Sequence, residues 1–168
     1  MDKIGLIYSF NTHKTSQAAD KIANEFGNGI EKVNAETLTE EQFLSFKKII
    51  IGVPTWFDGE LPNYWDEFVP AIEDMKLKGK KIAIFGNGNQ KGYPENFVDG
   101  IGIMAKLLED RGAKIVGFTS INGYEFESSR AVQGDQFAGL ALDFENHSSQ
   151  VNSKVKKWVE QLKKEFGS

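Results

Sequence analysis

Two kinds of hydrophobic pattern alternate along the chain, and their alternation predicts strands that alternate with helices. Short, nearly continuous apolar runs predict strands, and the run Ile49-Ile50-Ile51 is typical of a strand buried on both faces of a parallel sheet. Between these runs, apolar residues recur three or four positions apart, which is the spacing of one helix face. The predicted strands are 3–8, 30–33, 48–53, 81–85 and 114–118, and the predicted helices are 14–26, 65–75, 97–108 and 151–166.

Two further segments complete this prediction. Residues 39–42 (Thr-Glu-Glu-Gln) have the form of a capping box and predict the start of a short helix. Residues 119–147 show no regular period and are too long for an ordinary connection, so we interpret them as an insertion around the fifth strand, which resumes near 140–142. The alternation favours βαβ units with right-handed crossovers, and hence an α/β fold with a five-stranded parallel sheet and helices on both faces.

Length and composition indicate an ordinary soluble domain. The chain has 168 residues, of which 40% are hydrophobic and 26% charged, and this size suits a single domain over 1–168. No apolar run approaches the roughly 20 residues of a membrane span, and the N-terminal segment is interpreted as the first strand and not as a signal peptide. We therefore expect a cytoplasmic protein that does not bind a membrane.

The cysteine count, the histidine count and the net charge each exclude or disfavour certain kinds of site. The chain has no cysteine, which excludes disulfides, thiolate metal sites, iron–sulfur clusters and cysteine nucleophiles. It has two histidines, which argues against a histidine-rich metal centre. Its net charge of -4 argues against nonspecific nucleic-acid binding, because such binding needs a basic face.

A polar loop follows the first predicted strand and leads into a predicted helix. The free N–H groups and the dipole at a helix N-terminus attract an anion. The chain contains neither GxxxxGK[ST] nor GxGxxG, so a single phosphate monoester is favoured over a nucleoside triphosphate or a dinucleotide. The alternative is ordinary capping of the helix by Thr12. The loop consists of Ser9, Phe10, Asn11, Thr12, His13, Lys14 and Thr15.

Two more loops follow the third and fourth predicted strands. In the first, an exposed Trp-Phe pair is costly and usually has a partner; the alternative is that Trp56 folds back onto a helix. In the second, glycines allow the backbone to approach a ligand closely; the alternative is a turn with Tyr93 at its rim. The candidate residues are Pro54, Thr55, Trp56, Phe57, Asp58 and Gly59 in the first loop, and Gly86, Asn87, Gly88, Asn89 and Tyr93 in the second.

The three loops are expected to meet at one edge of the sheet. In a strand order of 2-1-3-4-5, strands one, three and four are neighbours, and ligands of open α/β sheets bind beyond the carboxyl ends of the strands. One site would then combine an anion cradle, two aromatic planes and several backbone donors and acceptors. This combination suits a flat, phosphorylated heteroaromatic ligand, of which flavin mononucleotide (FMN) is the obvious example.

The segments that carry these features resemble the flavodoxin family over nearly the whole chain. The strongest are KIGLIYSFNTHKT, IIIGVPTW, IAIFGNGNQKGYPENF and FAGLALDFEN, and the insertion at 119–147 resembles the long-chain subgroup. The resemblance implies a flavodoxin-like three-layer sandwich with sheet order 2-1-3-4-5. It also implies a low-potential, one-electron carrier that binds FMN and is not an enzyme.

The resemblance also implies roles for individual residues. The loop from Ser9 to Thr15 resembles the family's phosphate loop, and Trp56 and Tyr93 resemble the aromatic residues on the two flavin faces. The segment Phe57-Asp58-Gly59 resembles the one whose carbonyl turns toward flavin N5 on reduction. Residues 87–89 resemble the segment along the pyrimidine edge, Asn96 belongs to the matching NF pair, and Glu145 matches an acidic residue near the ribityl chain.

The chain departs from the family pattern at several of these positions. Phe10 replaces an expected hydroxyl ligand, His13 adds a cation beside the phosphate, and Asn89 stands where an aspartate is common. Two rival functions therefore stay open on the same fold. One is an FMN-dependent quinone or azo reductase, and the other is a flavodoxin-like module that has lost its ligand.

Charge placement suggests how partners are recognised. Lysines lie at the starts of the predicted strands, whereas acidic residues follow their ends, so the flavin edge is expected to be an acidic docking face for redox partner proteins. We expect the carrier to be a monomer. The acidic residues are Asp58, Glu60, Asp66, Glu67, Glu95, Asp99, Glu125, Glu127, Asp143 and Glu145.

Overall fold

The computed structural model describes residues 3–56 and 58–167 and contains the predicted parallel sheet. Its strands are paired in the order β2-β1-β3-β4-β5, and every pairing in this sheet is parallel, so the predicted order is confirmed. The strands are β1 (Ile4–Tyr8), β2 (Ile30–Asn34), β3 (Lys48–Gly52), β4 (Lys81–Asn87) and β5 (Lys114–Val116).

The fifth position of the sheet is shared by two strands. The first residues of β4 pair with β5, and its last three residues, Phe85–Asn87, pair with β9 (Leu140–Leu142). This second pairing is why β4 extends two residues beyond the predicted strand. Between β5 and β9 the chain forms a small antiparallel sheet of β6 (Thr119–Ser120), β8 (Gln136–Phe137) and β7 (Val132–Gln133), which confirms the insertion.

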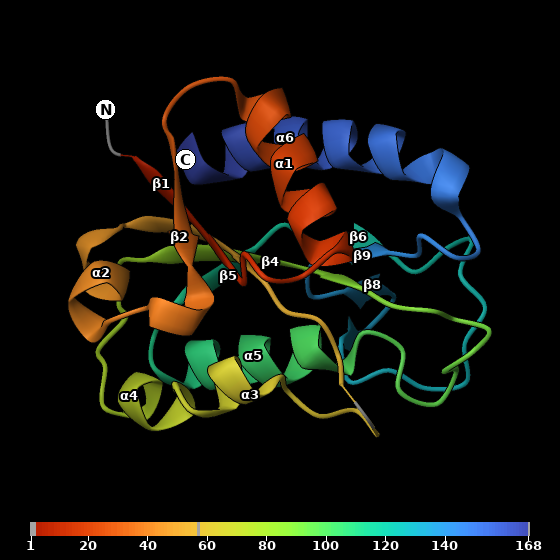
Figure 1. Ribbon diagram of the computed structural model, residues 1–168, viewed down its shortest axis with the longest axis horizontal. Helices are drawn as coiled ribbons and strands as arrows, with labels where there is room; N and C mark the ends of the chain where they lie inside the picture. Colours follow the sequence, from red (N-terminus) through yellow and green to blue (C-terminus); the bar gives the residue numbers. More distant parts are fainter. Residues whose placement is uncertain (1–2, 57, 168) are drawn as a thin grey trace.

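Helices cover both faces of the sheet, as predicted (Figure 1). On one face lie α1 (Lys14–Phe26) and α6 (Val151–Gly167), and on the other lie α3 (Asn63–Asp66), α4 (Val69–Glu73) and α5 (Asp99–Asp110). The predicted capping box is present at the start of α2 (Glu40–Ser45), where Thr39 and Gln42 cap each other. Two short 3-10 helices, η1 (Ala35–Thr37) and η2 (Ser148–Gln150), complete the chain.

The predicted helix over 65–75 is wrong, because the chain forms the two short helices α3 and α4 there. Pro70 lies in the first turn of α4, where its missing N–H is tolerated, but a continuous helix would place it in the interior and break it. The predicted helix over 97–108 begins later, at Asp99, because Val98 has a left-handed backbone with φ 47°.

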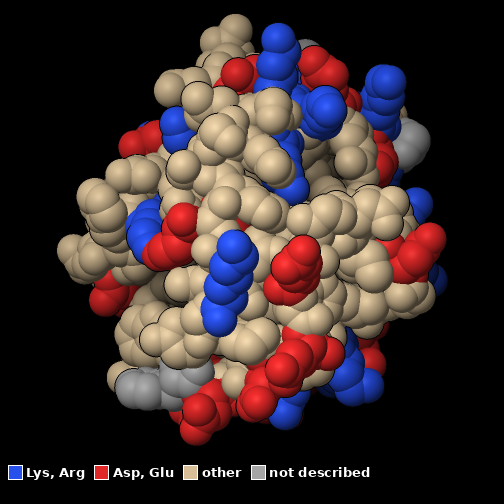
Figure 2. Space-filling view, turned by 90° about the vertical axis from the view of Figure 1, so that its right-hand side faces the viewer, with Lys and Arg blue, Asp and Glu red and all other residues tan. Residues whose placement is uncertain are grey.

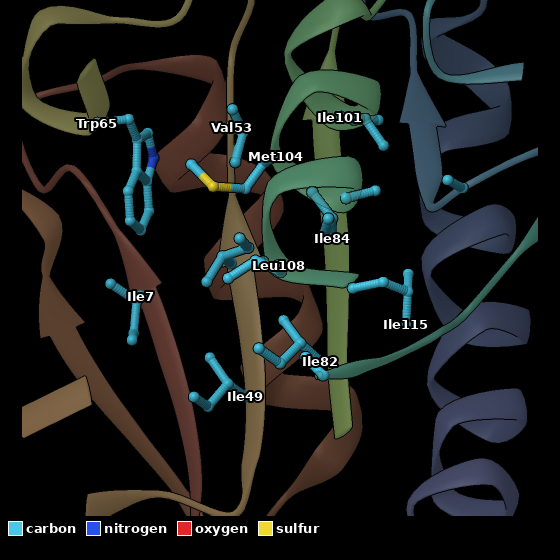
Figure 3. Packing of buried hydrophobic residues seen from close by; sticks show 14 of the residues in the cluster. Ile7, Ile49, Val53, Trp65, Ile82, Ile84, Ile101, Met104, Leu108 and Ile115 are labelled. Carbon is cyan, nitrogen blue, oxygen red and sulfur yellow. The ribbon is translucent and has the colours of Figure 1, made fainter. Parts of the chain in front are cut away.

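The core lies on both sides of the buried strands. Ile49, Ile50 and Ile51 are all fully buried, which confirms the interpretation of this run. Because side chains alternate along a strand, Ile49 and Ile51 pack in the layer with α5, whereas Ile50 packs with α1 and α6. Figure 3 shows the α5 layer, where Met104 and Leu108 face the isoleucines of the central strands. Each such side chain contributes about 1.5–3 kcal/mol by burial.

Two features of the described residues bear on function. Within 3–56 and 58–167, no helix has both the length and the apolar character needed to cross a membrane. The same residues contain no group of three or more histidine, aspartate or glutamate side chains placed to hold a metal ion.

Candidate functional site

The loops that follow β1, β3 and β4 enclose two adjoining cavities, and Trp56 and Asn87 line both. The first, which we call the ring cavity, has a volume of about 340 Å³. The second, which we call the anion cavity, has a volume of about 290 Å³. The ring cavity is lined by Thr55, Trp56, Asn87, Gly88, Asn89, Tyr93, Asn96, Phe97 and Val98, and the anion cavity by Thr12, His13, Lys14, Thr15, Pro54, Trp56 and Asn87.

A larger hollow of about 830 Å³ lies on the outer side of α5, beside Arg130 and Gln133 of the insertion. Its lining includes both acidic and basic side chains, and none of the three polar loops contributes to it. We therefore place the site at the two smaller cavities, where the carboxyl ends of neighbouring strands meet.

The anion cavity offers backbone donors at the start of α1. Among the described residues, the N–H groups of His13, Lys14 and Thr15 have no backbone acceptor, as expected for the first turn of a helix. The Thr12 hydroxyl does not cap this helix; it donates to the Ser9 carbonyl at 2.7 Å. Free N–H groups, the helix dipole and two basic side chains make this end suitable for an anion.

The beginning of the predicted phosphate loop has a different structural role. The Ser9 hydroxyl is buried and donates to the Glu36 carboxylate at 2.5 Å, and the Asn11 amide donates to the same oxygen at 2.8 Å. These hydrogen bonds, with that of Ser9 the stronger, lower the pKa of Glu36. The ring of Phe10 packs against Tyr8, with 5.0 Å between centroids. Residues 9–11 therefore shape the loop, and 12–15 line the cavity.

Glu36 was missed by the sequence analysis. A signal for it exists, because Glu36 follows β2, and β2 is the neighbour of β1 in the predicted strand order. An acidic residue beyond the end of β2 is therefore expected to lie beside the loop that follows β1. The same reasoning identifies no role for it in binding an anion, since its charge is negative.

A tight turn carries Trp56 on one side of the ring cavity. Trp56 and Glu60 exchange two backbone hydrogen bonds of 2.8 and 2.7 Å. Gly59 between them has φ 87°, and a Cβ atom there would lie 2.5 Å from the Asp99 carboxylate, so no other residue fits without a shift. The Asn96 amide donates to the Asp58 carbonyl at 3.3 Å and ties this turn to the start of α5. Phe57 lies outside the described residues.

The indole of Trp56 packs against a neighbouring ring and also lines the site. It meets the ring of Tyr64 edge to face, with 6.1 Å between centroids and an angle of 87°. It also lines both cavities, so the packing alternative and the binding hypothesis describe the same side chain. The Tyr64 hydroxyl is buried without a hydrogen-bond partner among the described residues, and burial, with a smaller contribution from Glu36, strongly raises the pKa of Tyr64.

The loop after β4 forms the other wall. Tyr93 is 67% exposed, so its ring is open to a ligand from the cavity. The Gly88 N–H donates to the Leu142 carbonyl at 2.8 Å, and a Cβ atom on Gly88 would lie 3.0 Å from Val98. Gly86 is buried within β4 and does not line either cavity. The Asn89 side-chain oxygen accepts from two N–H groups of its own loop.

Two predicted site residues form an ion pair at the edge of the anion cavity. Lys14 contacts the carboxylate of Glu145, although the two lie on segments far apart in the sequence. The positive charge of Lys14 is therefore partly balanced before any anion binds.

The remaining predicted residues hold the walls in place: Thr55 accepts from the Gly100 N–H at 2.8 Å, and Pro54 is buried beside it.

The predicted acidic face needs a correction. Asp99 and Asp143 are 2% exposed, because their carboxylates accept hydrogen bonds inside the protein, so they do not contribute to a surface. Figure 2 looks onto the loops after β1, β3 and β4 and shows acidic side chains gathered along its lower edge, with basic side chains among and above them. The exposed acidic residues near the site include Glu36, Asp58, Glu60, Glu95, Glu125, Glu127 and Glu145.

The chemistry of the lining residues favours binding over catalysis. The ring cavity is lined by amides, one threonine, aromatic rings and one valine, and these described residues include no carboxylate, imidazole or amine. Its side-chain hydroxyls are those of Thr55, which accepts from the Gly100 N–H, and Tyr93, and the described lining holds no carboxylate, imidazole or amine that could act as their base. The arrangement can hold a flat ring system beside Trp56 and Tyr93 and an anionic group at the start of α1.

Comparisons with known proteins agree with this geometry. The family model described as Flavodoxin matches residues 6–158. The chain is 42% identical to the flavodoxin of Nostoc sp. over 166 residues, covering 98% of both chains, and 36% identical to a flavodoxin of Klebsiella pneumoniae over 173 residues, again covering 98% of both. A crystal structure of Fusobacterium nucleatum flavodoxin bound to flavin mononucleotide superimposes with a TM-score of 0.93 at 30% identity, covering 98% of this chain and 99% of that one.

Proposed function

Because the chain belongs to the flavodoxin family, whose members are electron carriers and not enzymes, we propose that it binds FMN and transfers single electrons between redox partner proteins. The observation that carries this proposal is the junction of the ring cavity and the anion cavity at Trp56 and Asn87. A ligand with a flat ring at one end and a phosphate at the other fits this pair of cavities.

The phosphate of FMN would bind at the anion cavity. The N–H groups of residues 13–15 would be its donors, and His13 and Lys14 would supply positive charge. Thr12 and Thr15 would shape the wall of this cavity, since their hydroxyls donate to Ser9 and Asn87. Ser9, Phe10 and Asn11 support this loop through Glu36 and Tyr8. Glu145 holds Lys14 at the cavity edge, beside the ribityl chain.

The flavin ring would bind in the ring cavity between Trp56 and Tyr93. Residues 87–89 would follow its pyrimidine edge, and Asp58 and Gly59 belong to the segment that the family resemblance assigns to flavin N5. Asn96, Thr55 and Pro54 hold the two walls, and Gly86 pairs with Ala141 of β9 just before Asn87. When bound, FMN supplies the one-electron chemistry that the protein itself lacks.

The residues around the ring cavity would make the second reduction of FMN difficult. The fully reduced flavin is an anion, and the ring cavity offers it no cation. A desolvated negative charge without a partner is costly, and the acidic side chains of Asp58 and Glu60 add repulsion. We therefore infer a low potential for the second electron.

The reaction is tested by the visible spectrum of the FMN-loaded protein during stepwise anaerobic reduction. We expect a yellow protein that passes through a blue, long-wavelength, one-electron-reduced species before it bleaches. Direct bleaching would favour a two-electron reductase instead. Failure to take up FMN, in a protein whose circular dichroism shows an intact fold, would favour a module without a ligand.

We infer that redox partners dock at the exposed edge of the ring cavity, where acidic side chains gather (Figure 2). The transfer rate to a basic partner should fall markedly as ionic strength rises, because salt screens exposed charges. The variant Glu95→Gln should weaken this salt dependence, whereas Asp110→Gln, on the outer side of α5, should leave it unchanged. A salt-independent rate would contradict electrostatic docking.

We further propose that the chain works as one domain and a monomer in the cytoplasm. The two core layers share a single sheet, which supports one folding unit. Light scattering should give a mass near 18.8 kDa. A mass of twice that value, stable on dilution, would contradict the monomer.

A further inference from the structure

One buried carboxylate holds the loop after β4 from behind. Asp143 is 2% exposed, and its oxygens accept five hydrogen bonds. One oxygen accepts from the backbone and the side-chain amide of Gln90, at 3.0 and 2.8 Å, and from the Asn146 amide at 2.8 Å. The other accepts from the backbone N–H groups of Glu145 and Asn146. A protonated carboxyl group loses acceptor capacity, so this arrangement requires the ionised form.

The partners of Asp143 reach the wall of the ring cavity. The Asn146 amide also donates to the Asn89 side-chain oxygen at 2.8 Å, and Asn89 lines that cavity. Gln90 is itself 2% exposed, and its side-chain oxygen accepts from the Glu125 N–H of the insertion at 2.6 Å. Asp143 therefore connects the loop after β4, the segment after β9 and the insertion.

The charge of Asp143 is balanced by dipoles and not by a directly bonded cation. The titratable residues around its network include Tyr124, Lys154 and His147, and the exposed Glu125 and Glu145. The Lys154 ammonium donates to the Tyr124 hydroxyl at 2.6 Å and lies 3.9 Å from the centre of that ring. His147 contacts the Gln90 amide, with 3.3 Å between nitrogens. Among the described residues, no ion pair includes Asp143. A negative charge is therefore fixed in the interior, one bridging amide away from a cavity-lining side chain.

We propose that Asp143 is a positioning residue for the flavin. It fixes the loop of residues 87–93, and its negative charge lowers the reduction potential for the second electron. This inference rests on the proposed function. The loop places the aromatic ring of Tyr93 and the amide of Asn89, and the carboxylate opposes the negative charge that the second electron brings. Burial makes this repulsion stronger than that of a surface carboxylate, because solvent screens the latter.

The test is the pair of one-electron potentials in the variant Asp143→Asn. We expect the fully reduced flavin to bind about tenfold more tightly relative to the one-electron-reduced flavin, which raises the second potential by ~59 mV for a one-electron couple. The first potential should change little, because both of its flavin states are neutral. A purely structural role would weaken all three states equally and would leave both potentials unchanged.

Two further variants separate charge from positioning. Gln90→Met keeps the carboxylate but removes the side-chain hydrogen bonds, so it should weaken FMN binding in every redox state without moving the second potential. In the FMN-free protein, the amides of residues 88–93 should exchange with solvent at least tenfold faster. Glu125→Gln keeps the backbone N–H that donates to Gln90 and removes only an exposed charge, so it should shift the second potential far less than Asp143→Asn does.

A third variant keeps the inference testable if Asp143→Asn does not fold. Lys154→Met removes the nearest cation of the network and leaves Asp143 less compensated, so the second potential should fall. Its exposed neighbour Lys157 supplies the control, Lys157→Met, which should have a smaller effect. An unchanged second potential in folded Asp143→Asn, or in Lys154→Met, would overturn the inference. Failure of the unmodified protein to bind FMN would instead overturn the proposed function.

Discussion

The hydroxyl of Thr15 donates to the side-chain oxygen of Asn87 at 2.8 Å, across 72 positions of the sequence. Thr15 is in the first turn of α1, and Asn87 is the last residue of β4. The bond therefore joins the anion cavity to the residue that lines both cavities. It fixes the spacing of the two ends of the site before a ligand binds, and such preorganisation reduces the entropy lost on binding.

Removing this bond should weaken FMN binding. In Thr15→Val the shape of the side chain is kept and the donor is lost, so the dissociation constant should rise about two- to tenfold, the value of one hydrogen bond. Thr15→Ser keeps the hydroxyl and is the matched control. Fluorescence titration of the apoprotein with FMN measures both. Equal affinities of the two variants would contradict a role for the hydroxyl.

His13 should strengthen the binding of the FMN phosphate. It lines the anion cavity at the start of α1, where its ring can donate to an anion. The variant His13→Ala should bind FMN about two- to fivefold more weakly than the unmodified protein. Fluorescence titration of the two apoproteins with FMN measures this ratio. Equal affinities would show that His13 is a solvated loop residue.

Asn89→Asp should lower the potential of the second electron. The Asn146 amide bridges Asn89 and Asp143, so the new carboxylate would share one donor with an existing carboxylate and would add negative charge at the cavity wall. Like charges so placed disfavour a further negative charge on the flavin. Spectroelectrochemistry measures the potential, and Asn89→Ser provides a neutral comparison. A rise, or no shift, would count against the position of Asn89 along the flavin.

Asp143 should make the apoprotein sensitive to acid. Burial raises the pKa of Asp143, but hydrogen bonds from Asn146 and Gln90 outweigh it, so the net pKa is lowered. A lowered pKa means that the stabilisation is complete above about pH 4, the value of an unfolded aspartate, and is lost as pH falls through the folded value. The difference in unfolding free energy between the unmodified protein and Asp143→Asn should therefore shrink from pH 6 to pH 3. Urea unfolding at each pH gives this difference, and a constant value would contradict the assignment.

Trp65 should stabilise the end of β3, which leads into the turn that carries Trp56. Its indole is fully buried and donates to the Gly52 carbonyl at 3.0 Å. Trp65→Phe should lower the unfolding free energy by about 2 kcal/mol, because it removes core volume and leaves that carbonyl without its donor. Leu44→Ala, at a 42% exposed position, should change it by less than about 0.5 kcal/mol. Equal effects would contradict this role.

The sheet could be predicted from the sequence because the hydrophobic pattern and the conformational preferences of the residues agree. The run at 49–51 is apolar at every position, and the β-branched residues favour a strand, so both signals lead to a buried parallel strand. They disagree at 65–75. There the apolar spacing suits one helix, but Pro70 interrupts it, and a hydrophobic pattern does not record a missing N–H.

The sequence predicts which loops form the site, but it does not predict the direction in which each side chain points. The order of the strands places the three loops together, and the cavities lie between them. Whether a hydroxyl points at a ligand depends on partners from elsewhere in the chain, such as the bond of Ser9 to Glu36. For the same reason Gln90 was not identified and Asp143 was assigned to the acidic face, since their connection appears only when β9 returns to the edge of β4.

Because β5 and β9 share the fifth position of the sheet, the strand pairing does not depend on the length of the insertion between them. β5 pairs with the first half of β4 and β9 with the second, so the chain between them leaves the sheet and returns to the same edge. It is attached by aromatic packing of Phe126 and Phe137 against Phe97 and by hydrogen bonds such as that from the Glu125 N–H to Gln90. A chain that joined the two strand halves directly would keep the parallel pairing and would lose these attachments. The segment is thus a place where evolution, or a protein engineer, can add or remove residues without redesigning the sheet.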